Sequence, residues 1–200
     1  MELDHLFLFV KDEATAREMM RHAGLRANYS RTHPGQGTKN LCACLDDMYL
    51  ELLWLDGSPI AGPSKDSGLG ARGRCEGAPI GLAWRSEMDL DCIPFAAPFL
   101  PPGMSIPVAK TSFDRAQPFV FQSPGGVAPI NGDRDMVGQR QRPTYARLKE
   151  AIIRLPTTSQ LPAFMHHFER VHFATGEPSI EAELSAPYGS ATKQFTWSLN

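Results

Sequence analysis

The stretch Leu-Asp-His-Leu-Phe-Leu-Phe-Val at residues 3–10 decides how the fold begins. It is short, almost wholly apolar and followed by Lys11, which is typical of a buried β-strand. Asp12 is suited to cap a helix whose apolar positions between residues 16 and 23 recur with helical spacing. Gly24 is placed to end that helix in a left-handed conformation. The opening of the chain therefore predicts a strand followed by a helix.

Three further strands complete the first unit of the chain. We expect them at residues 25–31, 39–46 and 48–55, with a tight turn at Asp46-Asp47 between the last two. The order is a strand, a helix and then three strands. Residues 1–56 therefore predict one βαβββ module.

The rest of the chain divides into three parts. Residues 57–79 are rich in glycine, proline, serine and charge and predict a surface connection. Residues 80–133 predict a second, degenerate βαβββ module, whose helix is shortened by several prolines. Residues 134–200 predict a C-terminal half-module that completes or extends the sheet. Its expected elements are a strand over 148–155, a helix capped by Thr157-Thr158-Ser159 that runs to about His172, and strands over 180–184 and 193–199.

Composition and charge narrow the class of protein. Hydrophobic residues make up 42% of the chain and charged residues 21%, as in ordinary globular proteins. The net charge of −2 provides no basic field for nucleic acid or an anionic membrane, so neither partner is expected. The first residues lack the pattern of a secretory signal, and the four cysteines lack C-x-x-C spacing. We therefore expect a cytoplasmic protein with reduced thiols.

Two polar residues stand out on strands that are otherwise apolar. Alternation places His5 on one face of the first strand, together with Leu3, Phe7 and Phe9. On residues 48–55 it groups Glu51 with Tyr49, Leu53 and Leu55. An ionised Glu51 in this setting needs a cation, a proton or a hydrogen-bond donor. A divalent metal ion with His5 as co-ligand would supply that partner. The alternative is that Glu51 faces solvent and His5 is a hydrogen-bonded core residue.

The loop that follows the expected second strand is another candidate site. Within ten residues it gathers polar side chains of several kinds, namely Arg31, His33, Gln36, Thr38 and Asn40. Gly35 and Gly37 allow the backbone to approach a ligand closely. Arg31 could anchor a carboxylate and His33 could act as an acid or base. The alternative is a turn whose polar groups satisfy only its own backbone. Trp54, on the strand over 48–55, would line a pocket or pack in the core.

Several segments resemble the glyoxalase-like domain family of the vicinal oxygen chelate superfamily. They are LDHLFLFV at 3–10, RTHPGQGTKN at 31–40 and YLELLWL at 49–55, and PFVFQS at 118–123 resembles the closing strand of the family's second half. The resemblance covers roughly residues 2–133. It implies an α+β fold of paired βαβββ modules, whose curled mixed sheets surround a cavity.

The resemblance also implies a metal site built from the first and last strands of the two modules. His5, Glu51 and Gln122 match three of the family's ligand positions, and the fourth falls near residues 80–82, where no side chain can bind a metal. The implied cofactor is one divalent ion, such as Mn, Ni, Zn or Fe, which would act as a Lewis acid. The departure at the fourth position weakens the expectation of a tightly held ion.

Three hypotheses follow for the function. The first is a small-molecule enzyme, a metal-assisted lyase, isomerase or dioxygenase acting on an oxygen-rich substrate. In this hypothesis His33, Arg31 and Glu51 are catalytic, while Arg31, His33, Gln36, Thr38, Asn40 and Trp54 contact the substrate. The second is a non-catalytic protein that binds or sequesters a small molecule on the same fold. The third is that the C-terminal part mainly serves to assemble a homodimer. Fold alone does not choose among them.

Overall fold

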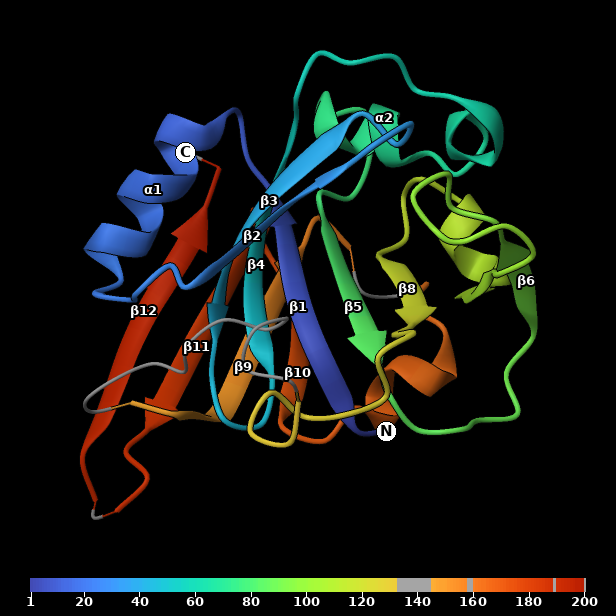
Figure 1. Ribbon diagram of the computed structural model, residues 1–200. Helices are drawn as coiled ribbons and strands as arrows, with labels where there is room; N and C mark the ends of the chain where they lie inside the picture. Colours follow the sequence, from blue (N-terminus) through green and yellow to red (C-terminus); the bar gives the residue numbers. More distant parts are fainter. Residues whose placement is uncertain (133–144, 158–159, 189, 200) are drawn as a thin grey trace.

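The computed structural model describes residues 1–132, 145–157, 160–188 and 190–199. It is an α+β fold with one mixed eight-stranded sheet and one mixed four-stranded sheet (Figure 1). The expected fold class is therefore confirmed. The expected boundary between the second module and the C-terminal extension, and the cap residues Thr158 and Ser159, lie outside the described residues.

The first module has the predicted order of elements. It comprises β1 (Leu3–Phe9), α1 (Glu13–His22), β2 (Tyr29–His33), β3 (Thr38–Cys44) and β4 (Tyr49–Leu55). The side chain of Asp12 accepts a hydrogen bond from the amide of Thr15 and caps α1. Gly24 follows the helix with φ of 61°, in the left-handed region that favours glycine. The strands lie in the order β2-β3-β4-β1, with β1 parallel to β4.

The second module repeats this strand pattern without its helix. It comprises β5 (Ile80–Trp84), β6 (Cys92–Phe95), β7 (Ile106–Ala109), η2 (Lys110–Phe113) and β8 (Phe119–Gln122). The order β5-β8-β7-β6, with β5 parallel to β8, matches the order of the first module. Residues 85–91, all of them described, form no helix. The connection between the modules carries two short helices, η1 (Gly62–Lys65) and α2 (Leu69–Gly73).

The two modules join along a backbone ladder in the middle of the large sheet. β1 and β5 pair antiparallel, with His5 opposite Ala83 and Phe7 opposite Gly81. A Cβ atom on Gly81 would lie 2.2 Å from the ring of Phe7, so only glycine fits there. Because of this seam, the eight strands form one continuous surface (Figure 1).

The C-terminal part forms its own sheet instead of extending the first one. It comprises β9 (Arg147–Leu155), η3 (Ala163–His167), β10 (Val171–Thr175), β11 (Ser179–Ser185) and β12 (Thr192–Ser198). The order β10-β9-β11-β12 differs from that of the two modules. The expectation that this part completes or extends the large sheet is therefore wrong.

The helix expected to run to about His172 is also corrected. Over residues 160–172, which are all described, the short η3 is the only helix, and Val171 begins a strand that pairs parallel with β9. Met165, Phe168 and Val171 are still buried, so their apolar spacing serves a 3₁₀ turn and a strand instead of one helix. Pairing with β9 satisfies the backbone in a way that local spacing does not reveal.

The C-terminal sheet and α1 cover the same face of the large sheet (Figure 1). Their apolar side chains form one core with Leu6, Leu50 and Leu82 of the large sheet. Trp197 of β12 donates its indole N–H to the carbonyl of Met19 in α1. The four-stranded sheet thus packs on the large sheet together with α1. Among the described residues, no helix is long and apolar enough to cross a membrane.

Candidate functional site

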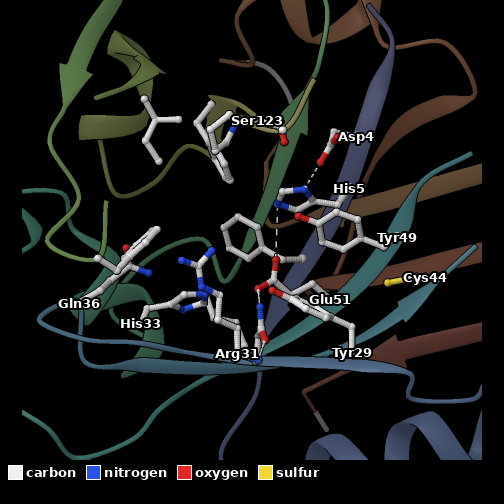
Figure 2. A pocket seen from close by; sticks show the side chains of 18 of the residues that line it. Asp4, His5, Tyr29, Arg31, His33, Gln36, Cys44, Tyr49, Glu51 and Ser123 are labelled. Carbon is white, nitrogen blue, oxygen red and sulfur yellow. Dashed lines mark hydrogen bonds and ion pairs between the residues drawn. The ribbon is translucent and has the colours of Figure 1, made fainter. Parts of the chain in front are cut away.

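The opposite face of the large sheet lines a cavity of about 390 Å³. This volume lies in the range of small-molecule pockets. Both modules contribute to the lining, which is strongly aromatic and includes Phe7, Tyr29, Tyr49, Phe95, Phe99, Phe119 and Phe121. Polar side chains gather in two places, one around His5 and one around His33 (Figure 2). An apolar chamber with a few polar groups is typical of a binding site for an organic molecule.

Strand alternation brings His5 and Glu51 to the cavity, as the sequence predicted. Tyr49, Glu51 and Leu53 line it, while Leu50 and Leu52 pack in the core on the other side. The expected grouping of Leu3 with His5 is wrong, because the pairing of β1 with β5 shifts register between these residues. Leu3 joins the core instead, and Asp4 lines the cavity beside His5.

A chain of polar contacts runs through the first polar group (Figure 2). The Nδ1 atom of His5 lies 2.7 Å from Oδ1 of Asp4, and its Nε2 atom lies 3.5 Å from Oε2 of Glu51. The other carboxylate oxygen of Glu51 accepts a hydrogen bond of 2.6 Å from the amide of Asn40. All four side chains are buried. Glu51 therefore accepts a hydrogen bond inside the protein and lies close to an imidazole, and it does not face solvent.

Charge and stacking hold His5 in this place. Burial alone would raise the pKa of Asp4, but the hydrogen bond and charge of His5, with the charge of Arg85, lower it below its usual value. The carboxyl of Asp4 is therefore ionised near neutral pH. The His5 ring stacks on Tyr49, with ring centroids 4.2 Å apart. Burial also raises the pKa of Tyr49 well above its usual value, so the phenol stays protonated.

The second polar group comes from β2, β3 and the turn between them. The Nδ1 atom of His33 lies 2.9 Å from the hydroxyl of Thr38, and Gln36 donates its amide to the same hydroxyl. Arg31 lies over the ring of Phe99 at 5.0 Å, and the ring of His33 also contacts Phe99, with centroids 5.1 Å apart. Arg31, His33, Gln36 and Asn40 line the cavity, whereas Thr38 is fully buried behind them. Much of the predicted loop is strand, because Arg31 to His33 pair with β3.

His33 is held as a neutral imidazole. Burial lowers its pKa below the usual value of 6.5, and nearby Arg31 acts in the same direction, against the opposing charge of Glu51. A neutral imidazole bonded to a hydroxyl is suited to donate or accept a hydrogen bond with a ligand.

Two predicted site residues lie elsewhere. Gln122 is on the opposite face of β8 from Phe121, and its amide donates to the carbonyl of Ser86. Phe121, one residue earlier, faces the cavity, so the expected ligand position was one residue out of phase. Trp54 packs in the core between the two sheets and does not line the cavity, which corrects its expected contact with substrate. In both cases alternation along the strand decides the face.

The residues present do not fit the three- or four-ligand metal site that the resemblance implies. The first module supplies His5 and Glu51. At the matching places of the second module, alternation brings Gly81 and Ala83 of β5 and Phe121 of β8 to the cavity face, and none can bind a metal. Among the described residues, no three His, Cys, Asp or Glu side chains are grouped to hold an ion.

Sequence reasoning missed Asp4 and the aromatic side chains that the second module contributes to the lining. Asp4 is next to His5 in the chain, so ordinary strand alternation would place the two side chains on opposite faces. The register shift in β1 brings the carboxyl group of Asp4 and the imidazole of His5 together. Phe99 lies in a turn after β6, which has no periodic pattern, and Phe121 lies on β8, where the cavity side was assigned to Gln122 instead. The adjacency of Asp4 and His5 was the one signal available.

Residues 3–90 match the family described as a glyoxalase-like domain. The resemblance drawn from the three motifs is therefore confirmed over these residues. A comparison with curated proteins finds no match.

The solved structures that are similar to this chain include two enzymes. One is a methylmalonyl-CoA epimerase, 16% identical, with a TM-score of 0.37, aligned over 61% of this chain and 94% of that one. The other is a mutant of 4-hydroxymandelate synthase from Streptomyces coelicolor, 11% identical, with a TM-score of 0.45. The latter alignment covers 98% of this chain and 62% of that one. At this level of similarity, the substrates of those enzymes say nothing about the substrate of this chain.

Proposed function

We propose that this chain, whose residues 3–90 form a glyoxalase-like domain, is an enzyme that transfers a proton on a small organic substrate. The observation that carries the proposal is the buried contact between Nε2 of His5 and Oε2 of Glu51, 3.5 Å apart at the cavity wall. Paired groups of this kind share one proton and can pass it to or from a bound molecule. The reaction class is an isomerisation or a lyase reaction that begins with removal of a proton next to a carbonyl.

Each residue of the first polar group has a separate role in this proposal. Asp4 accepts from Nδ1 of His5 and so leaves Nε2 to exchange the proton. Asn40 occupies one oxygen of Glu51 and leaves the other facing His5. The aromatic walls exclude water from the transferred proton. No step in this proposal requires a metal ion.

The second polar group supports a substrate that carries a carboxylate. Arg31 is exposed at the cavity and lies over Phe99, and the described part of the chain offers its guanidinium no acidic partner. Arginine binds carboxylates through two parallel hydrogen bonds. With His33 and Gln36 beside it, Arg31 would anchor the charged end while the aromatic walls contact the apolar body. The substrate class is a small organic acid with an apolar or aromatic portion.

A probe with these features tests the proposal. The compound 3-benzoylpropionate has a phenyl ring, a ketone with exchangeable neighbouring protons and a carboxylate. We expect it to raise the melting temperature of the protein, whereas the uncharged analogue butyrophenone raises it less. In D₂O, the wild type should accelerate exchange of the protons beside the ketone, as followed by NMR. Glu51→Gln and His5→Gln should lose most of this acceleration, by about 10²-fold or more.

A second candidate function is binding or sequestration without chemistry. It is favoured by the lining from the second module, which is mostly apolar, with Phe119 and Phe121, and which in the described residues adds the hydroxyl of Ser123 but no acidic or basic side chain. The same experiment separates the two candidates. A probe that binds tightly without any exchange above the solution rate supports the binding protein and rules out proton transfer on that probe.

A further inference from the structure

We propose that Arg85 is a positioning residue, which fixes the proton of His5 on Nδ1 by holding Asp4, and which ties this arrangement to the C-terminal sheet. The catalytic importance of Arg85 rests on the proposed function, whereas its effect on the protonation of the His5 ring does not. Arg85 immediately follows β5 and belongs to the second module, whereas Asp4 and His5 belong to the first. The second module would therefore contribute to the polar site from behind the cavity wall.

The guanidinium of Arg85 is buried, and each of its three nitrogens donates a hydrogen bond. Its side chain is only 2% exposed, and its Nε donates to Oδ2 of Asp4 at 3.1 Å. Its Nη1 atom donates both to the carboxylate of Glu2 and to the carbonyl of Asp47, each at 2.8 Å. A buried guanidinium with this many acceptors does not rotate freely, so its positive charge stays in one position.

The carboxylate of Asp4 contacts two neighbouring side chains. One of its oxygens faces Arg85 and the other faces Nδ1 of His5. Since the carboxylate is buried, it needs a cation to remain ionised. Arg85 supplies that charge and also sets the direction of the carboxylate. The oxygen left for His5 is then an acceptor, and the ring nitrogen opposite it must be a donor.

The same network reaches the C-terminal sheet through the turn between β3 and β4. The backbone carbonyl of Asp47 accepts a hydrogen bond from Arg85. The side-chain carboxylate of Asp47 accepts one from the backbone amide of Leu148 in β9. Arg170, just before β10, donates to the carboxylate of Asp47 and to the carbonyl of Leu148. Arg170 has φ of 64°, a left-handed conformation that costs a non-glycine residue energy. The C-terminal sheet therefore clamps the turn that holds Arg85.

The test is the ring nitrogen spectrum of His5 in ¹⁵N-labelled full-length protein, assigned with His5→Gln. Near neutral pH, we expect a protonated Nδ1 in the wild type. Asp4→Asn should move the proton to Nε2, because Arg85 keeps the amide oxygen and turns the amide N–H toward Nδ1. Arg85→Lys, which keeps the charge, should retain the wild-type spectrum. Arg85→Met should lose the single protonated Nδ1 signal and give mixed tautomers.

Controls separate positioning from stability. Arg154→Met removes an ion pair with Glu181 on the outer face of the C-terminal sheet, and Glu2→Gln removes the exposed partner of Arg85. Both should leave the His5 spectrum unchanged. A folded Arg85→Met protein with the wild-type spectrum would overturn the proposal. If Arg85→Met does not fold, Asp4→Asn decides, because a proton that stays on Nδ1 there contradicts the orienting role of Arg85. Failure of the exchange assay with an intact tautomer pattern would reject the proposed function alone.

Discussion

The ring of Phe121 lies edge-on to the imidazole of His5, with centroids 5.3 Å apart. The closing strand of the second module thus presents an aromatic ring to the place where a third ligand would have to stand. Gln122, the one residue of β8 able to offer an oxygen, lies on the other face of the strand. At the cavity end that holds His5 and Glu51, β8 therefore contributes an edge-on aromatic contact and not a metal ligand.

Replacing this ring should create a metal site. We expect Phe121→His to add a third ligand to His5 and Glu51 and to retain Zn²⁺ or Ni²⁺ in stoichiometric amount, as measured by elemental analysis after dialysis. The matched control is Gln122→His on the opposite face, which should retain no more metal than the wild type. Stoichiometric metal in the wild type, lost in both His5→Ala and Glu51→Ala, would show that two protein ligands suffice.

Stability should fall in mild acid because of His33. Its pKa in the folded protein lies below the usual value of 6.5 through burial. The unfolded chain therefore binds a proton at a higher pH than the folded chain does. The contribution of His33 is fully present above 6.5 and is lost as the pH falls from there through the lowered pKa. Urea unfolding between pH 7.5 and 5 should show this decline, and His33→Asn should show a smaller one.

Gly81 should tolerate no side chain. A Cβ there would meet two ring atoms of Phe7 at 2.2 Å and the carbonyl of Phe119 at 2.4 Å. Gly81→Ala should lower the free energy of unfolding by about 1–3 kcal/mol through overpacking. It should also weaken probe binding, because the displaced Phe7 ring moves toward the cavity. Gly125→Ala is the control for the free energy of unfolding, since its Cβ would meet only the hydroxyl of Ser123 at ordinary contact distance.

The buried thiols should be unreactive in the folded state. Burial raises the pKa of Cys44 to about 12, with Glu51 and Asp4 adding to the shift, and raises that of Cys42 still more clearly. The thiolate is the reactive form. Iodoacetamide at pH 8 should therefore label the exposed Cys75 first and leave Cys42 and Cys44 until the protein unfolds in urea. Mass spectrometry of peptides measures this order, and rapid labelling of Cys44 in the native protein would contradict the burial argument.

The parts of the fold that the sequence could predict are those that local patterns control. The cap at Asp12, the left-handed Gly24 and the alternation around Glu51 each depend on a few neighbouring residues. The position of Gln122 does not, because the face of a short strand is set by its pairing with β5. The same holds for Val171, whose pairing with β9 replaces the expected helix.

The site was predictable to a similar extent. His5, Glu51 and the polar residues of β2 and β3 were found from residue type and alternation, and the structure places them around one cavity. Asp4 joins them only through a register shift between strands that are far apart in the chain. Arg85 comes from another module, and its contact with Asp4 leaves no periodic signal in the sequence.

The seam between β1 and β5 has a consequence for how a ligand enters and leaves. Because these strands pair from Leu3 to Leu8, the floor of the cavity cannot open like a hinge without breaking the central ladder. Entry must then depend on the segments at its rim, where Phe99 and residues 123–129 contribute to the lining. Movements of surface loops occur in nanoseconds to microseconds, faster than the rotation of whole domains. Exchange of ligands should thus be limited by small side-chain and loop displacements over a rigid base.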